Sequence, residues 1–232
     1  MQPFIGMAGI GLAIACSGAA AADPVVVLEL YTSQGCSACP PADALLHELS
    51  QQDGVMAFSF HVNYWDYIGW ADTFASRDNG QRQKTYAHGF GERMVYTPEM
   101  VVQGQAAVVG HKAAKIKALI DKVRDLPPAA EVEAVRDGDM IRVTLLPAEA
   151  PDDEAEVYVI RFLPQATVQI GRGENAGREV TYSNVVMDWH LAEIWSGKDR
   201  QELSLPVTGD LPVAVLVQER GQGPVLAAAL AR

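Results

Sequence analysis

Two cysteines at a predicted junction between a strand and a helix constrain the fold more than any other feature of the sequence. Residues 25–31 form an apolar run that opens with three valines, which is typical of a strand buried on both faces. Residues 32–35 have the composition of a turn, and Cys36 and Cys39 follow with C-x-x-C spacing. Two prolines and Asp43 come next, and both residue types are favoured in the first turn of a helix. The sequence therefore predicts two thiols at a helix N-terminus, where the thiol pKa falls and attack on a disulfide is favoured.

The same spacing also occurs in zinc sites and in structural disulfides. A zinc site needs a second pair of ligands, but no cysteine follows Cys39 and no two of the five histidines have H-x(3–5)-H spacing. A structural bond that closes so short a loop constrains the unfolded chain little. A redox-active pair is therefore the preferred hypothesis, with a structural bond and a metal site as alternatives. We predict no cofactor and assign no metal ligands.

The first 22 residues resemble a secretory signal peptide. They carry no charged side chain, residues 4–15 are mostly apolar or small, and three alanines end the segment at Ala22. Such a segment is too short to span a membrane as a helix and predicts cleavage after Ala22. The residues before Cys16 loosely resemble a lipoprotein cleavage box, so anchoring at Cys16 is the alternative. The expected location is periplasmic or secreted.

The charge of the chain limits its partners. It has 18 basic and 29 acidic residues, a net charge of −11, and no basic cluster. Nucleic acids and anionic membranes are therefore poor partners. No further apolar run of about 18 residues follows the predicted signal peptide, so we expect no spanning segment. The expected partner is a protein or small-molecule thiol or disulfide.

The order of the predicted elements in the first half is βαβ…ββα. After the first helix, hydrophobic patterns predict strands at 55–62, 99–103 and 106–109. A helical period of apolar residues then predicts a helix that ends near residue 123. The C-x-x-C pair lies at the first strand–helix junction, and a Thr-Pro dipeptide precedes the third strand.

This order resembles the thioredoxin fold, in which a cis-proline faces the cysteine pair and the adjacent backbone binds an extended substrate. The resemblance implies that Pro98 faces Cys36, the more exposed and nucleophilic thiol, and that Cys39 resolves the intermediate. Thr97 would then lie beside the substrate. Glu29 would correspond to a buried acid that removes the proton from Cys39, and the alternative is a strand residue at the sheet edge.

Three segments resemble a family more narrowly than the order of elements does: TSQGCSACPPADALL, HVNYWDYIGW and VYTPEMVVQG. Together they resemble the signatures of a family of secreted thioredoxin-like proteins, domain of unknown function 1223. The resemblance covers residues 24–231. It implies a fold and an export route, and it supplies no activity.

An aromatic-rich insertion separates the second and third predicted strands, at about residues 63–95. Its aromatic residues Tyr64, Trp65, Tyr67 and Trp70 are expected to wall a substrate groove beside the cysteines or to form a small core that ties the insertion to the sheet. His61 ends the second strand. It is a candidate for proton transfer near pH 7, or a hydrogen-bonded structural residue.

Two prolines at 127–128 predict a linker. Beyond it, short strands separated by turns at intervals of about 8–12 residues favour a β-sandwich. We therefore predict an α/β thioredoxin-like domain at 23–126, followed by a mostly-β, sandwich-like region at 129–232. A polar, glycine-rich loop at 171–178 is expected to be an ordinary long hairpin; the alternatives are that it reaches over the thiol site or binds a partner.

Three functions are consistent with these features. The first is thiol–disulfide exchange on envelope proteins or small thiols, in which Cys36 attacks and Cys39 resolves the mixed disulfide. The second is a non-catalytic envelope binding module with a static disulfide. The third is Cu(I) binding by the C-x-x-C pair together with His61, because soft thiolates select Cu(I).

Overall fold

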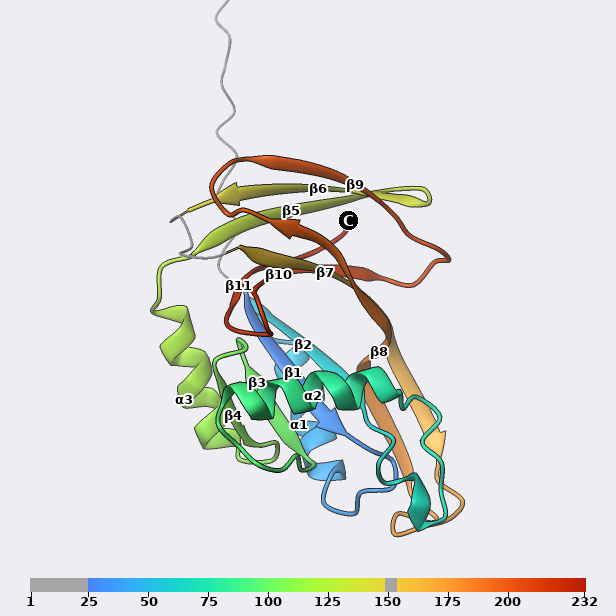
Figure 1. Cartoon of the computed structure of the whole chain (residues 1–232). Helices are drawn as coiled ribbons and strands as arrows, with labels where there is room; N and C mark the ends of the chain where they lie inside the picture. The colour runs from blue at the N-terminus through green and yellow to red at the C-terminus, as the bar shows by residue number, and fades with distance from the viewer. Residues whose placement is uncertain (1–24, 149–153) are drawn as a thin grey trace, which may run out of the picture.

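The computed structural model describes residues 25–148 and 154–232, which form eleven strands, three α-helices and one short 3-10 helix (Figure 1). The elements are β1 (Val26–Thr32), α1 (Pro40–Ser50), β2 (Val55–His61), η1 (Asp66–Ile68), α2 (Arg77–Gly89), β3 (Glu99–Val102), β4 (Ala106–Val109), α3 (Ala113–Arg124), β5 (Ala130–Asp137), β6 (Met140–Pro147), β7 (Ala155–Gln169), β8 (Glu179–Trp195), β9 (Gln201–Pro206), β10 (Val213–Glu219) and β11 (Val225–Leu230). The predicted signal peptide, its cleavage after Ala22 and the alternative site at Cys16 lie outside the described residues.

Eight of these strands form one mixed sheet in the order β11-β10-β7-β8-β2-β1-β3-β4. Strands β1 and β2 are parallel, and β1 and β3 are antiparallel. Strand β8 joins the other edge of β2 through a parallel pairing of Ser59 with Val185. The first and second halves of the chain therefore share one sheet.

The predicted fold class is wrong. The described chain is mostly β, and four strands that we assigned to a separate sandwich-like region, β7, β8, β10 and β11, extend the sheet that contains β1–β4. A thioredoxin-like α/β domain followed by a β-sandwich is therefore not the architecture. Hydrophobic alternation identifies a strand and its buried face. It does not identify the neighbouring strand with which that strand pairs.

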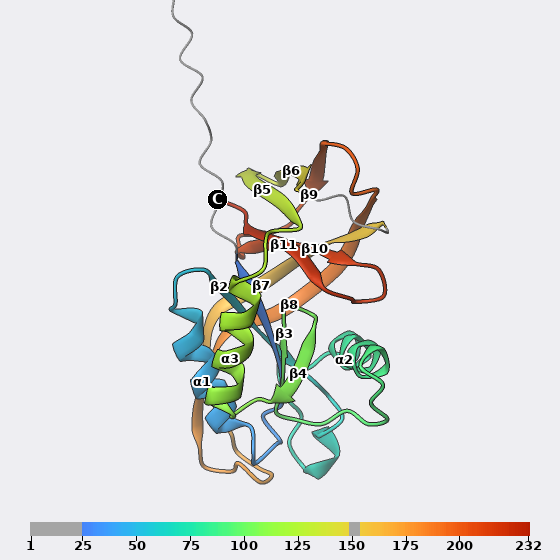
Figure 2. The same ribbon diagram turned by 90° about the vertical axis from the view of Figure 1, so that its left-hand side faces the viewer.

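Alternation along β1 places different side chains on the two faces of the sheet. Leu28 and Leu30 pack with residues of α1 and α3. Val27 and Tyr31 point to the opposite face and join a cluster that contains Tyr86 of α2. Figure 2 shows α1 and α3 on one side of the sheet and α2 on the other. The two faces therefore offer separate environments to neighbouring residues of one strand.

The remaining strands form a three-stranded sheet in the order β5-β6-β9, which stacks on the part of the large sheet built by β7, β10 and β11 (Figure 1). The core between these layers includes Ile141 and Val143 from β6 and Val157, Val159 and Val215 from the large sheet. Strands β7 and β8 are 15 and 17 residues long. Their hairpin therefore extends from this packed end to the opposite end of the molecule.

Candidate functional site

Cys36 and Cys39 form a disulfide between the end of β1 and the start of α1. Cys39 is the N-cap residue of α1, and prolines occupy the first two helical positions. This confirms the predicted place of the pair at a helix N-terminus. Both cysteines are buried, with 2% of Cys36 and none of Cys39 exposed. Cys36 is therefore scarcely more accessible than Cys39, although we expected it to be the exposed thiol.

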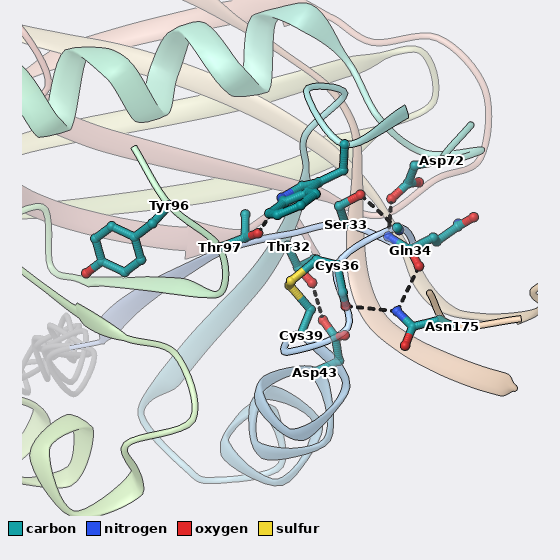
Figure 3. The surroundings of a disulfide bond; sticks show 12 residues. Thr32, Ser33, Gln34, Cys36, Cys39, Asp43, Asp72, Tyr96, Thr97 and Asn175 are labelled. Atoms are coloured by element: carbon teal, nitrogen blue, oxygen red, sulfur yellow. Dashed lines mark hydrogen bonds between the residues drawn. A yellow bond between two sulfur atoms is a disulfide. The ribbon is translucent and has the colours of Figure 1, made fainter. Parts of the chain in front are cut away.

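Asp43 lies in the first turn of α1, four residues after Cys39, and it is buried. The Asp43 amide donates to the Cys39 carbonyl at 3.1 Å, so both residues follow helical geometry and their side chains share one face of the helix. Thr32 Oγ1 donates to Asp43 Oδ1 at 2.8 Å (Figure 3). Burial raises the pKa of Asp43 from 3.8 to about 7, against the opposing effects of His61 and of the Thr32 hydrogen bond.

His61 is buried on the same side of the sheet as Asp43. It pairs in register with Thr32 on β1, so the two side chains are neighbours on that face. His61 Nδ1 lies 2.7 Å from Asp72 Oδ2. The carboxylate of Asp72 also accepts hydrogen bonds from the backbone amides of Gln34 at 2.7 Å and Phe74 at 2.9 Å. Asp72 therefore connects His61 to the turn that precedes Cys36.

Glu29 does not meet the disulfide. It points to the face of β1 opposite α1, where Arg82 of α2 donates to both of its carboxylate oxygens at 2.7 Å. The hydroxyl groups of Tyr31 and Tyr86 also donate to it, at 2.9 and 2.7 Å. We predicted this acid to lie one position out of register with its family counterpart, and one position along a strand reverses the face. Asp43 is the carboxyl group that we missed, and its i, i+4 spacing from Cys39 was the available signal.

The Thr97–Pro98 peptide is cis, as predicted. Pro98 packs near the start of α1: a Cβ atom on Gly110 would lie 3.0 Å from Pro98 Cβ and 3.1 Å from Ala42 Cβ. The Thr97 side chain is among the groups that surround the disulfide in Figure 3. Its hydroxyl accepts a hydrogen bond from Trp65 Nε1 at 2.6 Å. The structure therefore places Thr97 and Trp65 beside the cysteine loop, and Pro98 close to the first turn of α1.

The aromatic insertion packs partly against the cysteine loop and partly against α2. Trp65 Cβ would lie 3.2 Å from a Cβ atom on Gly35, so Trp65 packs against the cysteine loop. Trp70 Nε1 donates to the side chain of Gln34 at 2.8 Å. Tyr64 points instead to α2, where its hydroxyl donates to Gln83 at 3.2 Å. Tyr67 stacks on Trp65 and is exposed.

The hairpin loop between β7 and β8 reaches the disulfide. Asn175 Nδ2 donates to the carbonyl oxygens of Cys36 at 2.8 Å and Gln34 at 3.0 Å, and Asn175 is buried (Figure 3). Gly171 and Gly173 allow the loop to pack against Trp70, because a Cβ atom at either position would lie within 3.4 Å of it. We expected an ordinary long hairpin rather than a loop that reaches the thiol site; the structure shows the loop at the site, and nothing in the sequence identified Asn175.

Within residues 25–148 and 154–232, no group of three or more His, Cys, Asp and Glu side chains is placed to hold a metal ion. None of the described helices is long and apolar enough to cross a membrane.

A family model described as "Protein of unknown function (DUF1223)" matches residues 27–218. The chain is similar to a crystal structure of a structural genomics target from Agrobacterium tumefaciens, with 30% identity and a TM-score of 0.76 over 90% of this chain and 94% of that one. It is also similar to HBP35 of Porphyromonas gingivalis, with 15% identity and a TM-score of 0.58 over 90% of this chain and 74% of that one. The second likeness concerns the fold alone. No curated protein matches the chain.

Proposed function

Because the chain belongs to the DUF1223 family of proteins of unknown function, we propose its function from its own residues: Cys36 and Cys39 carry out thiol–disulfide exchange. The observation that carries this proposal is the position of the pair. The disulfide lies at the N-terminus of α1, and a buried carboxyl group with a pKa of about 7, Asp43, lies on the same helical face as Cys39. A helix N-terminus stabilises a thiolate, and the carboxyl group can give or take a proton.

In the reductive half of the reaction, a substrate thiolate attacks Cys36 Sγ. The Cys36–Cys39 bond breaks, its electron pair passes to Cys39 Sγ, and protonated Asp43 supplies the proton that neutralises this sulfur. A second substrate thiolate attacks the substrate sulfur of the mixed disulfide, which forms the substrate disulfide and releases Cys36 as a thiolate. The same steps in reverse reduce a substrate disulfide and re-form the Cys36–Cys39 bond, and Asp43 then accepts the proton from Cys39.

We assign substrate contact to Thr97 and to Trp65, whose indole holds the Thr97 hydroxyl beside the disulfide. We also propose that the protein is exported to the periplasm or secreted. The uncharged, mostly apolar first 22 residues and the disulfide itself support this location, because disulfides persist in oxidising compartments.

The deciding experiment is the reduction potential of the pair, measured on the mature protein in glutathione buffers by alkylation and mass. The reduction potentials of working thiol–disulfide oxidoreductases lie between about −120 and −270 mV. A potential below about −300 mV would mean that the disulfide is a static structural bond. The burial of both cysteines is also compatible with a structural bond.

Turnover of a model disulfide by two variants provides the second arm. Cys36→Ser removes the attacking sulfur and should abolish turnover. Cys39→Ser keeps the attack but removes resolution, so mixed disulfides should accumulate. Unchanged turnover in Cys36→Ser would rule out the proposed exchange.

A further inference from the structure

One side chain of α2, Gln83, is completely buried and makes three hydrogen bonds. Its Nε2 donates to the carbonyl oxygen of Tyr96 at 2.7 Å and to Oε2 of Glu99 at 2.6 Å. Its Oε1 accepts from the hydroxyl of Tyr64 at 3.2 Å. Because a carbonyl oxygen can only accept, these partners fix which end of the amide carries the nitrogen. Both ends of the Gln83 amide are therefore in use.

Two of these partners are the chain neighbours of the residues to which we assign substrate contact. Tyr96 immediately precedes Thr97, and Tyr64 immediately precedes Trp65. Trp65 and Thr97 are themselves joined, because Trp65 Nε1 donates to the Thr97 hydroxyl at 2.6 Å. The Tyr96 side chain points away from the disulfide, so it is the backbone of this residue that Gln83 holds (Figure 3). One buried amide therefore fixes both sides of the contact between Thr97 and Trp65.

The helix that carries Gln83 is anchored to the sheet by other side chains. Arg82 donates to both carboxylate oxygens of Glu29 at 2.7 Å. Asn79 Nδ2 donates to the carbonyl oxygen of His61 at 2.9 Å. Loss of the Gln83 hydrogen bonds should therefore leave α2 in place and release the two segments that Gln83 connects.

We propose that Gln83 is a positioning residue of the exchange site. It holds the Tyr96 backbone and the Tyr64 side chain so that Thr97 and Trp65 keep the spacing in which a substrate contacts both of them beside the disulfide. Because Gln83 is fully buried, it acts on a substrate only through these neighbours. This inference rests on the proposed exchange reaction for its functional meaning.

Hydrogen exchange of the tryptophan indole N–H groups, followed by proton NMR in the oxidised mature protein, tests the positional part. Gln83→Met keeps the length of the side chain but loses the amide, so exchange at Trp65 should become about tenfold faster. The indole of Trp189 donates to Asn79 of the same helix at 3.1 Å and should keep its exchange rate. Gln81→Met changes an exposed glutamine of α2 and is the matched control, in which neither rate should change.

Tyr64→Phe is a milder variant that removes only the bond to Gln83 Oε1. It should speed exchange at Trp65 by about threefold. The double variant Gln83→Met/Tyr64→Phe should be no faster than Gln83→Met alone, because both substitutions break the same chain of contacts. An unchanged Trp65 rate in Tyr64→Phe would overturn the proposal even if Gln83→Met fails to fold. Equal acceleration at Trp65 and Trp189 in Gln83→Met would also overturn it, because Gln83 would then only hold α2.

Turnover of a glutathionylated peptide, with dithiothreitol as the reductant, tests the functional part. Gln83→Met should raise KM by about tenfold and leave kcat within about twofold of the wild type, because binding is lost and the sulfur chemistry is kept. The reduction potential of the Cys36–Cys39 pair should be the same in both proteins. An unchanged KM in a variant whose Trp65 indole exchanges faster would overturn the proposal. A wild type that fails to turn over the peptide would refute the proposed exchange, whereas indole exchange would still decide whether Gln83 controls the contact between Thr97 and Trp65.

Discussion

Glu29 and Arg82 form a two-point ion pair, with both N–O distances at 2.7 Å and both side chains about 1% exposed, on the face of β1 opposite the disulfide. The Arg82 guanidinium also lies within 5.7 Å of four aromatic ring centroids, those of Phe60, Tyr86, Tyr158 and Trp189. This pair ties α2 to the sheet. It has no contact with the cysteines.

Removal of one partner should therefore destabilise the fold without changing the chemistry. Arg82→Met leaves Glu29 buried without a counter-charge and should lower the free energy of unfolding by about 3–5 kcal/mol. The double variant Glu29→Gln/Arg82→Met should recover part of that loss. Urea unfolding measures both. A change in the reduction potential of the Cys36–Cys39 pair in the folded double variant would contradict the separation of the two faces.

The stability of the protein should depend on pH through Asp43. Folded Asp43 keeps its proton up to about pH 7, whereas the ordinary pKa of 3.8 applies when the chain unfolds. Between these values the folded state binds more protons, so the free energy of unfolding falls as pH rises from about 4 to about 7. At about 1.4 kcal/mol per pKa unit, this contribution is at most roughly 4 kcal/mol.

The Asp43→Asn variant lacks this dependence and keeps an oxygen that can accept from Thr32. Its stability relative to the wild type should therefore improve between pH 4 and pH 8, as measured by urea unfolding of the oxidised proteins. Burial also raises the pKa of Glu99 to about 7, but this occurs in both proteins and cancels in the difference. A difference that is constant over this pH range would contradict the raised pKa of Asp43.

Asn175 should slow access to the disulfide. Its side chain bonds to the carbonyl oxygens of Cys36 and Gln34, so Asn175→Ala removes two hydrogen bonds, each worth about 1 kcal/mol. We expect reduction by a small thiol to become up to roughly thirtyfold faster, at about 1.4 kcal/mol per factor of ten. Asn184→Gly is the control, because Asn184 bonds to Ala57 away from the disulfide and has a positive φ that glycine tolerates. If both variants were reduced faster by the same factor, the cause would be a general loosening of the fold and not the loss of the Asn175 hydrogen bonds.

Gly110 should be intolerant of a side chain. A Cβ atom there would lie 2.8 Å from Leu30 Cδ1, and the Pro98 and Ala42 Cβ atoms are also within 3.1 Å. Gly110→Ala should therefore cost about 1–3 kcal/mol of unfolding free energy through overpacking. Gly89→Ala, at the end of α2, has nothing within 4 Å of the added atom and should be nearly neutral in the same measurement. Similar losses in both variants would contradict close packing at Gly110.

The local unit around the cysteines was predictable because its causes are close in sequence. The valine run of β1, the turn, the two prolines and Asp43 are contiguous, and each has a conformational preference that its neighbours share. The cis peptide before Pro98 was implied instead by the resemblance of a short segment to the thioredoxin fold. Structure that depends on contiguous residues in this way can be predicted without knowledge of how the rest of the chain packs.

The choice of carboxyl group was not predictable in the same way. Glu29 and Asp43 are both buried acids near the pair in sequence, and only the direction of each side chain separates them. Because alternate strand residues face opposite sides of a sheet, the position of the helix that carries the cysteines decides which acid meets them. That position is a property of the packed molecule.

By itself, the sequence determined that a buried strand leads through a turn to two thiols at a helix N-terminus, and that a polar, glycine-rich loop lies far along the chain. Only the tertiary structure decided that β8 pairs with β2, that one sheet unites the two halves of the chain, and that Asn175 reaches Cys36. Local preferences depend on neighbouring residues, whereas strand pairing and burial depend on hydrogen-bonding edges and apolar faces that meet only when distant segments pack together.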